Sequence, residues 1–163
     1  MIPEIDVQLA AIAKSLTDNV LPAIDPANPM AVEQMHLALA TLGLVRQRLP
    51  DLHAWLRRDL ADNLALARTI GADEAAIAES DRTLALPERS PQQIEAQVRA
   101  LKEAIAARID VVRGTDAARS VAEAVIAAQE PMILRTRAWA IGMGFEPDPS
   151  QIPNLSDLLE AKA

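Results

Sequence analysis

The chain has 163 residues, the length of one ordinary domain, and its hydrophobic fraction of 50% excludes an intrinsically disordered protein. Its 23 acidic and 16 basic residues give a net charge of −7, which argues against nucleic acid as a partner. The absence of cysteine excludes disulfides, thiolate catalysis and cysteine-based zinc sites.

The hydrophobic residues are mainly Ala and Leu, while the chain has no Tyr and a single Phe, Phe145. Ala and Leu are the strongest helix formers, whereas strands are usually built from aromatic and β-branched residues. The composition therefore predicts an all-α fold.

The first fifty residues predict two helices separated by a proline-rich loop. The first helix is expected from about Pro3 to Leu21. The second is expected from an N-cap at Asn28, with Pro29 behind it, to about Arg48. Spacings of three and four residues define the apolar stripe of the first helix: Ile5, Leu9, Ile12, Leu16 and Val20.

The second of these helices is apolar on two sides. Its main stripe consists of Val32, Met35, Leu39, Leu42 and Leu49. Leu37 and Leu44 lie on another side. A helix with this pattern is expected to contact more than one neighbour.

The next forty residues predict a long helix, a short helix and a linker. Pro50 disfavours helix at the residue before it, so a third helix is expected from Asp51 to Ile70, with Gly71 as its C-cap. A short helix is expected over Asp73–Leu86. The segment Pro87–Pro91 has the composition of a linker.

The last part of the chain predicts two long helices and a tail. Ser90 and Gln93 have the spacing of a capping box and predict a helix that ends at Gly114. The next helix is expected from Thr115 to about Gly142, and Pro131 within it predicts a kink. The tail, 144–163, is acidic and rich in proline, with a possible short terminal helix after Asn154. Together these elements predict a single-domain, mostly antiparallel bundle of five to six helices over residues 1–163.

No segment has the sequence of a membrane anchor or a secretion signal. The first residues lack the basic and apolar regions of a signal peptide. The longest uncharged stretch, Gln34 to Val45, is too short to span a bilayer as a helix. We therefore expect a cytoplasmic protein without membrane insertion.

Candidate catalytic and metal-binding groups are few. Glu33 and His36 have the Glu-x-x-His spacing of di-iron carboxylate bundles, but Pro50 occupies the position where His53 would need its own Glu. We therefore expect Glu33 and His36 to form a surface or interface pair. Asp62 is expected to pair with Arg58 on a solvated helix face. The sequence predicts no catalytic residue, no metal and no cofactor.

The segment from Pro131 to Trp139 is the main candidate for a ligand site. Arg135 shares a helix face with Met132 and Trp139, which places a charge on an otherwise apolar stripe. Such an arginine pairs with an acid of a neighbouring helix, extends to solvent, or binds an anion. In the last case Arg135 and Trp139 hold a carboxylate or phosphate beside an apolar pocket near the Pro131 kink.

Residues from about Ile5 to Ile70 resemble the opening of an uncharacterised family of short helical bacterial proteins. The residues that carry the resemblance are Val20-Leu21-Pro22-Ala23 and the Ala/Leu-rich helix Leu37–Leu49. Members are often encoded beside acyl-CoA dehydrogenases and aminoglycoside-phosphotransferase-like proteins. The family's closing Pro-Arg-Tyr segment is missing, because this chain has no tyrosine. The resemblance implies an accessory role and no catalytic residue.

Two functions stay open at this point. The absence of a catalytic constellation and the two apolar sides of the second helix favour a non-enzymatic accessory or interaction protein. Its partner is another protein or a second copy of itself, as in a homodimer. The alternative is a binding protein or enzyme for an anionic or acyl-type ligand, with its pocket near Pro131.

Overall fold

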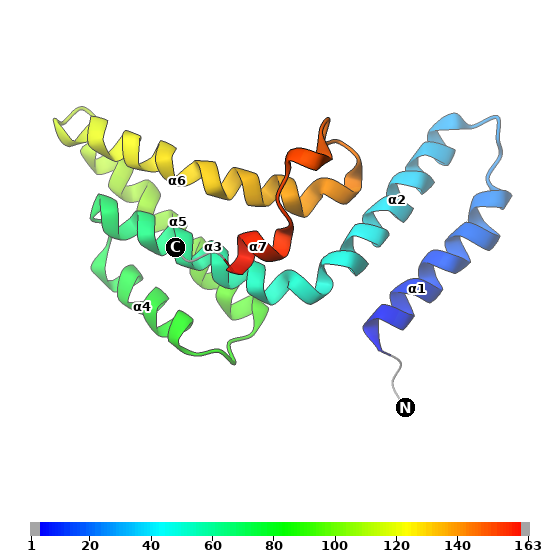
Figure 1. Ribbon diagram of the computed structural model, residues 1–163, viewed down its shortest axis with the longest axis horizontal. Coiled ribbons are helices and arrows are strands. Elements are labelled where there is room, and N and C mark those ends of the chain that lie inside the picture. Colours follow the sequence, from blue (N-terminus) through cyan, green and yellow to red (C-terminus); the bar gives the residue numbers. More distant parts are fainter. Residues whose placement is uncertain (1–3, 161–163) are drawn as a thin grey trace. The chain divides into compact units, whose positions relative to one another are not determined.

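The computed structural model describes residues 4–160, and all regular secondary structure in this range is helical (Figure 1). Six helices have eleven residues or more, and the short helix α7 follows them. The prediction of an all-α helical bundle is confirmed. The helices belong to two compact units, each described by itself below. The expected extent of a single domain, 1–163, stays a prediction.

The hairpin unit contains the first two helices and lies within Met1–Pro50 and Ala140–Pro149. Helix α1 (Ile5–Ser15) continues through a π-helical turn (Leu16–Val20) and a 3-10 turn (Leu21–Ala23). The expected helix end at Leu21 thus falls within these irregular turns, and the expected start, Pro3, lies outside the described residues.

Helix α2 (Pro29–Arg48) has the predicted bounds. The side chain of Asn28 accepts a hydrogen bond from the backbone N–H of Ala31 at 3.2 Å, which confirms the predicted N-cap.

The two helices of the hairpin pack on each other without burying a large core. Leu9 and Leu16 of α1 and Leu39 of α2 are half-buried, but no residue of α1 is buried. Arg46 Nε and Nη2 donate to the two carboxylate oxygens of Asp6 at 2.6 and 3.0 Å, which ties the helices together. These hydrogen bonds hold the pKa of Asp6 below its ordinary value.

A 3-10 turn from late in the chain (Ile141–Met143) completes the hairpin unit by packing on the C-terminal end of α2. A Cβ atom at Gly142 would lie 2.9 Å from Oε1 of Gln47. The absence of a side chain at Gly142 therefore permits this close approach.

The bundle unit contains α3 (Leu52–Ile70), α4 (Glu74–Ala85), α5 (Pro91–Val112), α7 (Leu155–Glu160) and α6 (Ala117–Ala140) up to Trp139. Successive helices from α3 to α6 run in alternating directions (Figure 1). Gly71 ends α3 with φ 66°, a left-handed conformation that glycine adopts without strain. Ser90 and Gln93 form the predicted capping box at the start of α5.

The core of the bundle unit lies where α3, α4 and α5 pack closely together. Leu60 of α3 and Ile94 and Leu101 of α5 have no exposed surface. Helix α6 is attached less tightly, because Val121, Arg135 and Ala138 are the buried residues of its length. Grooves consequently remain along the line where α6 meets α3 and α5.

Pro131 lies inside α6 and does not interrupt it. The helix ends at Ala140, slightly before the predicted end at Gly142, and the 3-10 turn follows. Because proline has no N–H, the carbonyl of Ala127 loses its usual donor four residues further on. Among residues 4–160, no helix combines the length and hydrophobicity needed to cross a bilayer.

Candidate ligand site between α3 and α6

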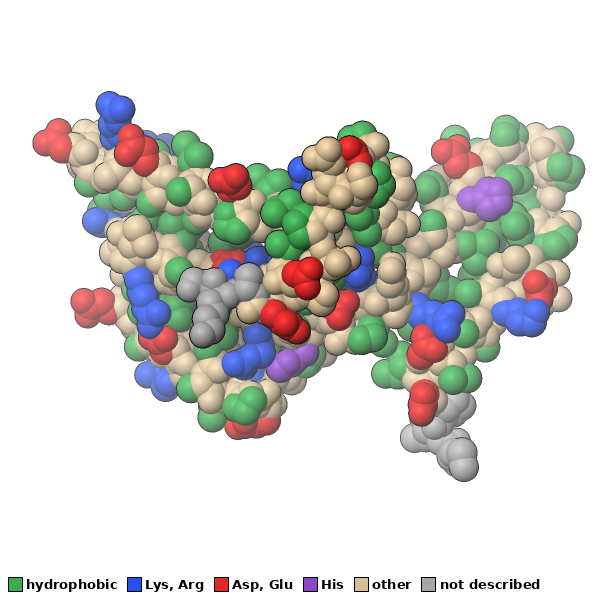
Figure 2. Space-filling view, in the orientation of Figure 1, with side chains coloured by type: hydrophobic (Ala, Val, Ile, Leu, Met, Phe, Trp, Pro, Cys, Tyr) green, Lys and Arg blue, Asp and Glu red, His purple; other side chains and the backbone are tan. Residues whose placement is uncertain are grey.

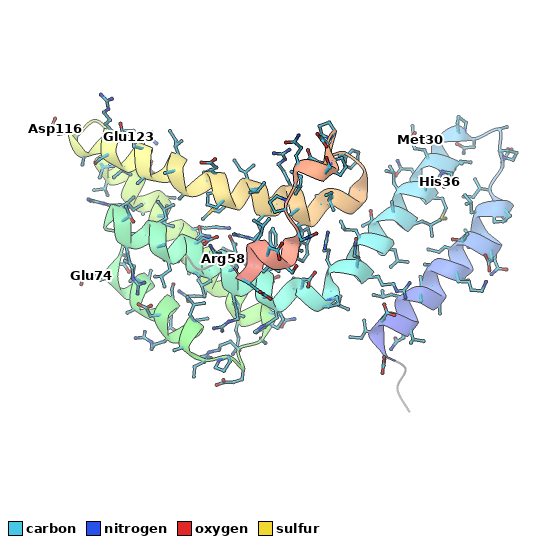
Figure 3. All side chains as sticks on the ribbon, viewed as in Figure 1. Met30, His36, Arg58, Glu74, Asp116 and Glu123 are labelled. Atoms are coloured by element: carbon cyan, nitrogen blue, oxygen red, sulfur yellow. The ribbon has the colours of Figure 1, made fainter. Side chains whose placement is uncertain are left out.

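Two arginines share one carboxylate inside the bundle unit. Arg135 Nη1 of α6 donates to Oδ2 of Asp62 on α3 at 2.5 Å. Arg58 Nε, one turn before Asp62 on the same helix, lies 3.0 Å from its Oδ1. Figure 3 shows the position of Arg58 on α3. Each oxygen of the carboxylate is therefore next to a different guanidinium.

These three charges are largely removed from water. The exposed fractions of the side chains are 3% for Arg135, 9% for Asp62 and 13% for Arg58. Removing charges from water is costly, and the cost is offset where opposite charges and hydrogen bonds are close. Two cations and one anion leave this cluster, the Asp62 triad, with a net charge of +1.

One aromatic ring from α3 and one from α6 lie beside the Arg135 end of the triad. The ring centroids of Trp55 and Trp139 are 4.5 Å apart, with an angle of 52° between the planes. The guanidinium carbon of Arg135 lies 5.3 Å from the centre of the Trp55 ring, within the range of a cation–π contact. The rings and Asp62 together fix the position of Arg135.

A groove of about 490 Å³ opens beside the triad, on the surface between α3 and α6. Arg58, Asp62 and Thr69 supply its polar side chains. The other lining residues are small or apolar: Ala65, Leu66, Ala124, Ala127, Ala128 and Pro131. A groove of this size with a few polar groups is suited to a small molecule.

The structure places the two predicted site residues apart from this groove. Arg135 is paired with Asp62, so it makes the bridge to a neighbouring helix that was one of its three expected arrangements. Trp139 packs on Trp55, and neither Arg135 nor Trp139 lines the groove at Pro131. The guanidinium that reaches the groove belongs to Arg58.

The predicted environment of Arg58 and Asp62 is wrong. Their pairing at one helical turn is confirmed, but the pair is largely buried and does not lie on a solvated face. The spacing of apolar residues around Asp62 could have predicted this burial from the sequence. Trp55, Asp62 and Leu66 are separated by seven and four residues, which places Asp62 on the same side of α3 as two large apolar residues.

Several other arginines of the bundle unit have purely structural contacts. Arg57 Nη2 donates to the carbonyl of Leu84 at 2.5 Å and so satisfies the end of α4. Arg108 Nε donates to the carbonyl of Ile70 at 2.9 Å and so satisfies the end of α3. These bonds explain part of the arginine content of the chain without a ligand.

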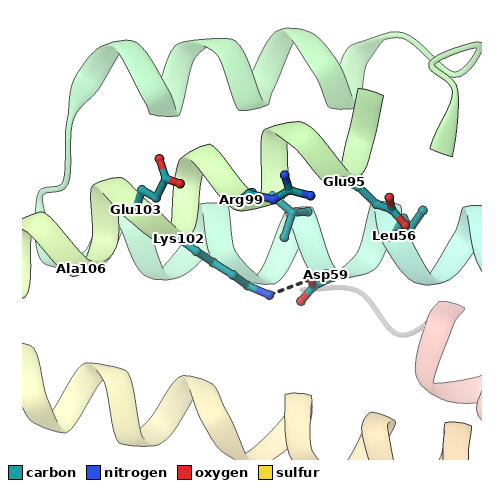
Figure 4. A pocket seen from close by; sticks show the side chains of 8 residues that line it. Leu56, Asp59, Glu95, Arg99, Lys102, Glu103 and Ala106 are labelled. Atoms are coloured by element: carbon teal, nitrogen blue, oxygen red, sulfur yellow. Dashed lines mark hydrogen bonds and ion pairs between the residues drawn. The ribbon is translucent and has the colours of Figure 1, made fainter. Parts of the chain in front are cut away.

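A second groove, between α3 and α5, is lined by charges of both signs (Figure 4). Its basic residues are Arg99 and Lys102, and the latter donates to Asp59 Oδ2 at 3.0 Å. Asp59, Glu95 and Glu103 supply three acidic groups. This mixture has no surplus of positive charge for an anion, so the α3–α6 groove is the better candidate.

The two histidines lie on different helices, His36 on α2 and His53 on α3. His36 is exposed on α2, and the ring Nε2 of His53 lies 3.1 Å from the carbonyl of Arg89. In the part of the chain from residue 4 to residue 160, no three His, Asp or Glu side chains gather as metal ligands would. The expected pair of Glu33 and His36 is exposed on α2.

No family model, curated protein or solved structure matches this chain. Similarity to other proteins therefore contributes nothing to the choice between the two functions. The resemblance of Ile5–Ile70 to a family of short bacterial proteins stays an expectation.

Proposed function

We propose that this chain is a cytoplasmic, non-enzymatic accessory protein that associates with a second copy of itself through α2. One observation carries the proposal. Helix α2 has no charged residue from Gln34 to Val45, yet Arg48 is the single buried residue in its length. The solvent-facing side of a surface helix normally carries charged residues. A helix that lacks charged residues over three turns is suited to burial on more than one side.

One side of α2 packs on α1, while the N-terminal part of another side is exposed. Met35, Leu39 and Leu42 are half-buried on the side of α1. On another side, Met30 and Leu37 have exposed fractions of 63% and 42%. Hydrophobic side chains are also visible on the surface of α1 and α2 in Figure 2. We call the side defined by Met30, Leu37, Thr41 and Leu44 the second stripe of α2; its last member, Leu44, is half-buried beside Gly142 of the 3-10 turn.

The charged residues of α2 favour a second copy of the chain, in antiparallel orientation, as the partner that covers the second stripe. Met30, Leu37 and Leu44 recur every seven residues, the spacing at which two helices pack side by side. A two-fold axis between Leu37 and Leu44 brings Leu37 of each copy beside Leu44 of the other. It also brings Glu33 near the basic end of the other α2, and it opposes the helix dipoles. A parallel pair would bring like charges together.

The oligomeric state tests this proposal. Native mass spectrometry at micromolar concentration is expected to give twice the mass of the 17.5 kDa chain. Leu37→Glu is expected to give the monomer, because it places a carboxylate in the apolar contact. A monomeric wild-type protein would refute self-association.

Leu86→Glu is a matched control for that experiment. Leu86 has an exposed fraction of 37%, close to that of Leu37, but it follows α4 in the bundle unit. The control is expected to leave the mass doubled. Circular dichroism of both variants verifies that the helices remain, so a loss of mass with intact helices identifies the interface.

A further inference from the structure

We propose that the α3–α6 groove binds a small organic monocarboxylate with an apolar body, and that Arg58 is the residue that recognises the carboxylate. This inference is independent of self-association through α2, because every residue of the groove belongs to the bundle unit.

The first argument is the hydrogen-bonding state of Arg58. Its Nε forms an ion pair with Asp62 without a hydrogen bond, and no hydrogen bond joins its two terminal nitrogens to another group in residues 4–160. The terminal nitrogens of a guanidinium form a planar fork that matches the two oxygens of a carboxylate. Because Arg58 lines the groove, this fork is available to a bound molecule.

The second argument is the charge of the Asp62 triad. Its surplus of one positive charge is held by side chains that are at least 87% buried, where water screens charge poorly. Neither a lysine nor another arginine lines the groove. One monoanion neutralises the surplus. A doubly charged phosphate would exceed this surplus, and Asp62, which lines the same groove, would repel it more strongly than a monoanion.

The third argument is the wall of the groove. Beyond Arg58, Asp62 and Thr69, the space is bordered by Leu66, Pro131 and alanines of both helices. Such a wall favours an apolar body over a sugar or a nucleotide, whose hydroxyl groups would lose water without gaining partners. The ligand class is therefore a carboxylate attached to a short hydrocarbon.

A series of straight-chain acids tests the proposal by NMR of the full-length protein. Acetate, butyrate and hexanoate are titrated up to about 10 mM, a range that detects weak ligands. The amide signals of residues 124–130 and 58–69 are expected to shift saturably with hexanoate. Each added CH2 is expected to tighten binding by up to about fourfold as it leaves water. No saturable shift with hexanoate would overturn the proposal.

Two further probes separate the head group from the hydrocarbon. Hexanol has the same chain without the charge, and inorganic phosphate is an anion of higher charge without the chain. Both are expected to bind at least tenfold more weakly than hexanoate. Equal binding of hexanol would overturn the role of Arg58, and tighter binding of phosphate would overturn the carboxylate specificity.

Arg58→Gln tests the residue directly. It leaves Arg135 and Asp62 as a neutral pair, so the variant is expected to fold. Its affinity for hexanoate is expected to fall at least tenfold. Arg99→Gln, in the α3–α5 groove, is the matched control and is expected to bind like the wild type. Unchanged affinity in Arg58→Gln would refute the assignment.

A second variant keeps the test valid if Arg58→Gln fails to fold. Ala127 is exposed and lines the groove, so Ala127→Leu fills space without entering the core. It is expected to weaken hexanoate binding and to leave acetate binding nearly unchanged. Equal affinity of the wild type and Ala127→Leu for hexanoate would place the hydrocarbon elsewhere and overturn the site.

Discussion

At the scale of single residues, Asp62 is the carboxylate that two largely buried guanidinium groups share. It neutralises one of two guanidinium groups, and both are largely buried. Most other ion pairs in the described chain lie at the surface, such as Arg68 with Asp81, whose side chains are about half exposed. Identical substitutions at the two aspartates therefore have different costs.

Asp62→Asn is expected to lower the free energy of unfolding by about 3 kcal/mol, because it leaves two buried cations without an anion. The surface change Asp81→Asn is expected to cost less than about 1 kcal/mol. Urea titrations followed by tryptophan fluorescence measure both. Similar losses for the two variants would mean that the burial of the triad has no energetic consequence.

At the scale of elements, the helix ends are where local sequence and structure agree best. Asn28, Gly71 and the capping box at Ser90 all have the predicted roles. A cap depends on residues within one turn, so the sequence contains all the information needed. The π-helical turn after α1 was not predicted, because the spacing of its apolar residues is that of an α-helix.

Ser90→Ala is expected to lower the free energy of unfolding by about 1 kcal/mol, since it removes the acceptor for the N–H of Gln93. Ser120→Ala, within α6, is the control. Ser120 is exposed and bonds only within its own helix, where alanine is the better helix former. Thermal unfolding that ranks Ser120→Ala as the more damaging variant would contradict the role of the cap.

The ion pair between Asp6 of α1 and Arg46 of α2 makes the stability of the hairpin unit depend on pH. Hydrogen bonds from Arg46 lower the pKa of Asp6, so the ionised carboxylate favours the folded hairpin. This contribution is fully present above the ordinary pKa of about 4, and it is lost as the pH falls through the lowered value.

Carbon-detected NMR of Asp6 is expected to show a pKa below the ordinary value. In Arg46→Gln the pKa of Asp6 is expected to return to the ordinary range, because the hydrogen bonds from the guanidinium are gone. An identical titration of Asp6 in the two proteins would show that the ion pair does not form in solution.

At the scale of the whole molecule, the two units differ in how they are stabilised. The bundle unit has a continuous hydrophobic core, whereas α1 has no buried residue. The sequence predicted the helices of both units. It could not predict the Asp62 triad, because Arg135 lies 73 residues beyond Asp62 and their meeting depends on which helix faces pack together. Local periodicity contains little information about such distant partners.

We expect the hairpin unit to unfold before the bundle unit. Trp55 and Trp139 both lie in the bundle unit, so tryptophan fluorescence reports on that unit, while circular dichroism reports on all helices. In urea, the loss of helix signal is expected to begin at lower concentration than the change in fluorescence. Coincident transitions would show that the units unfold as one.

The chain path of the hairpin unit has a consequence during synthesis. Its α1–α2 segment leaves the ribosome before the turn Ile141–Met143 that packs on α2, which follows about ninety residues later. At typical elongation rates the C-terminal end of α2 waits on the order of ten seconds for that turn. Nascent chains on one polysome hold such segments close together. The same uncharged surface that suits α2 for pairing thus makes this interval the period in which the chain is most exposed to premature association or to chaperones.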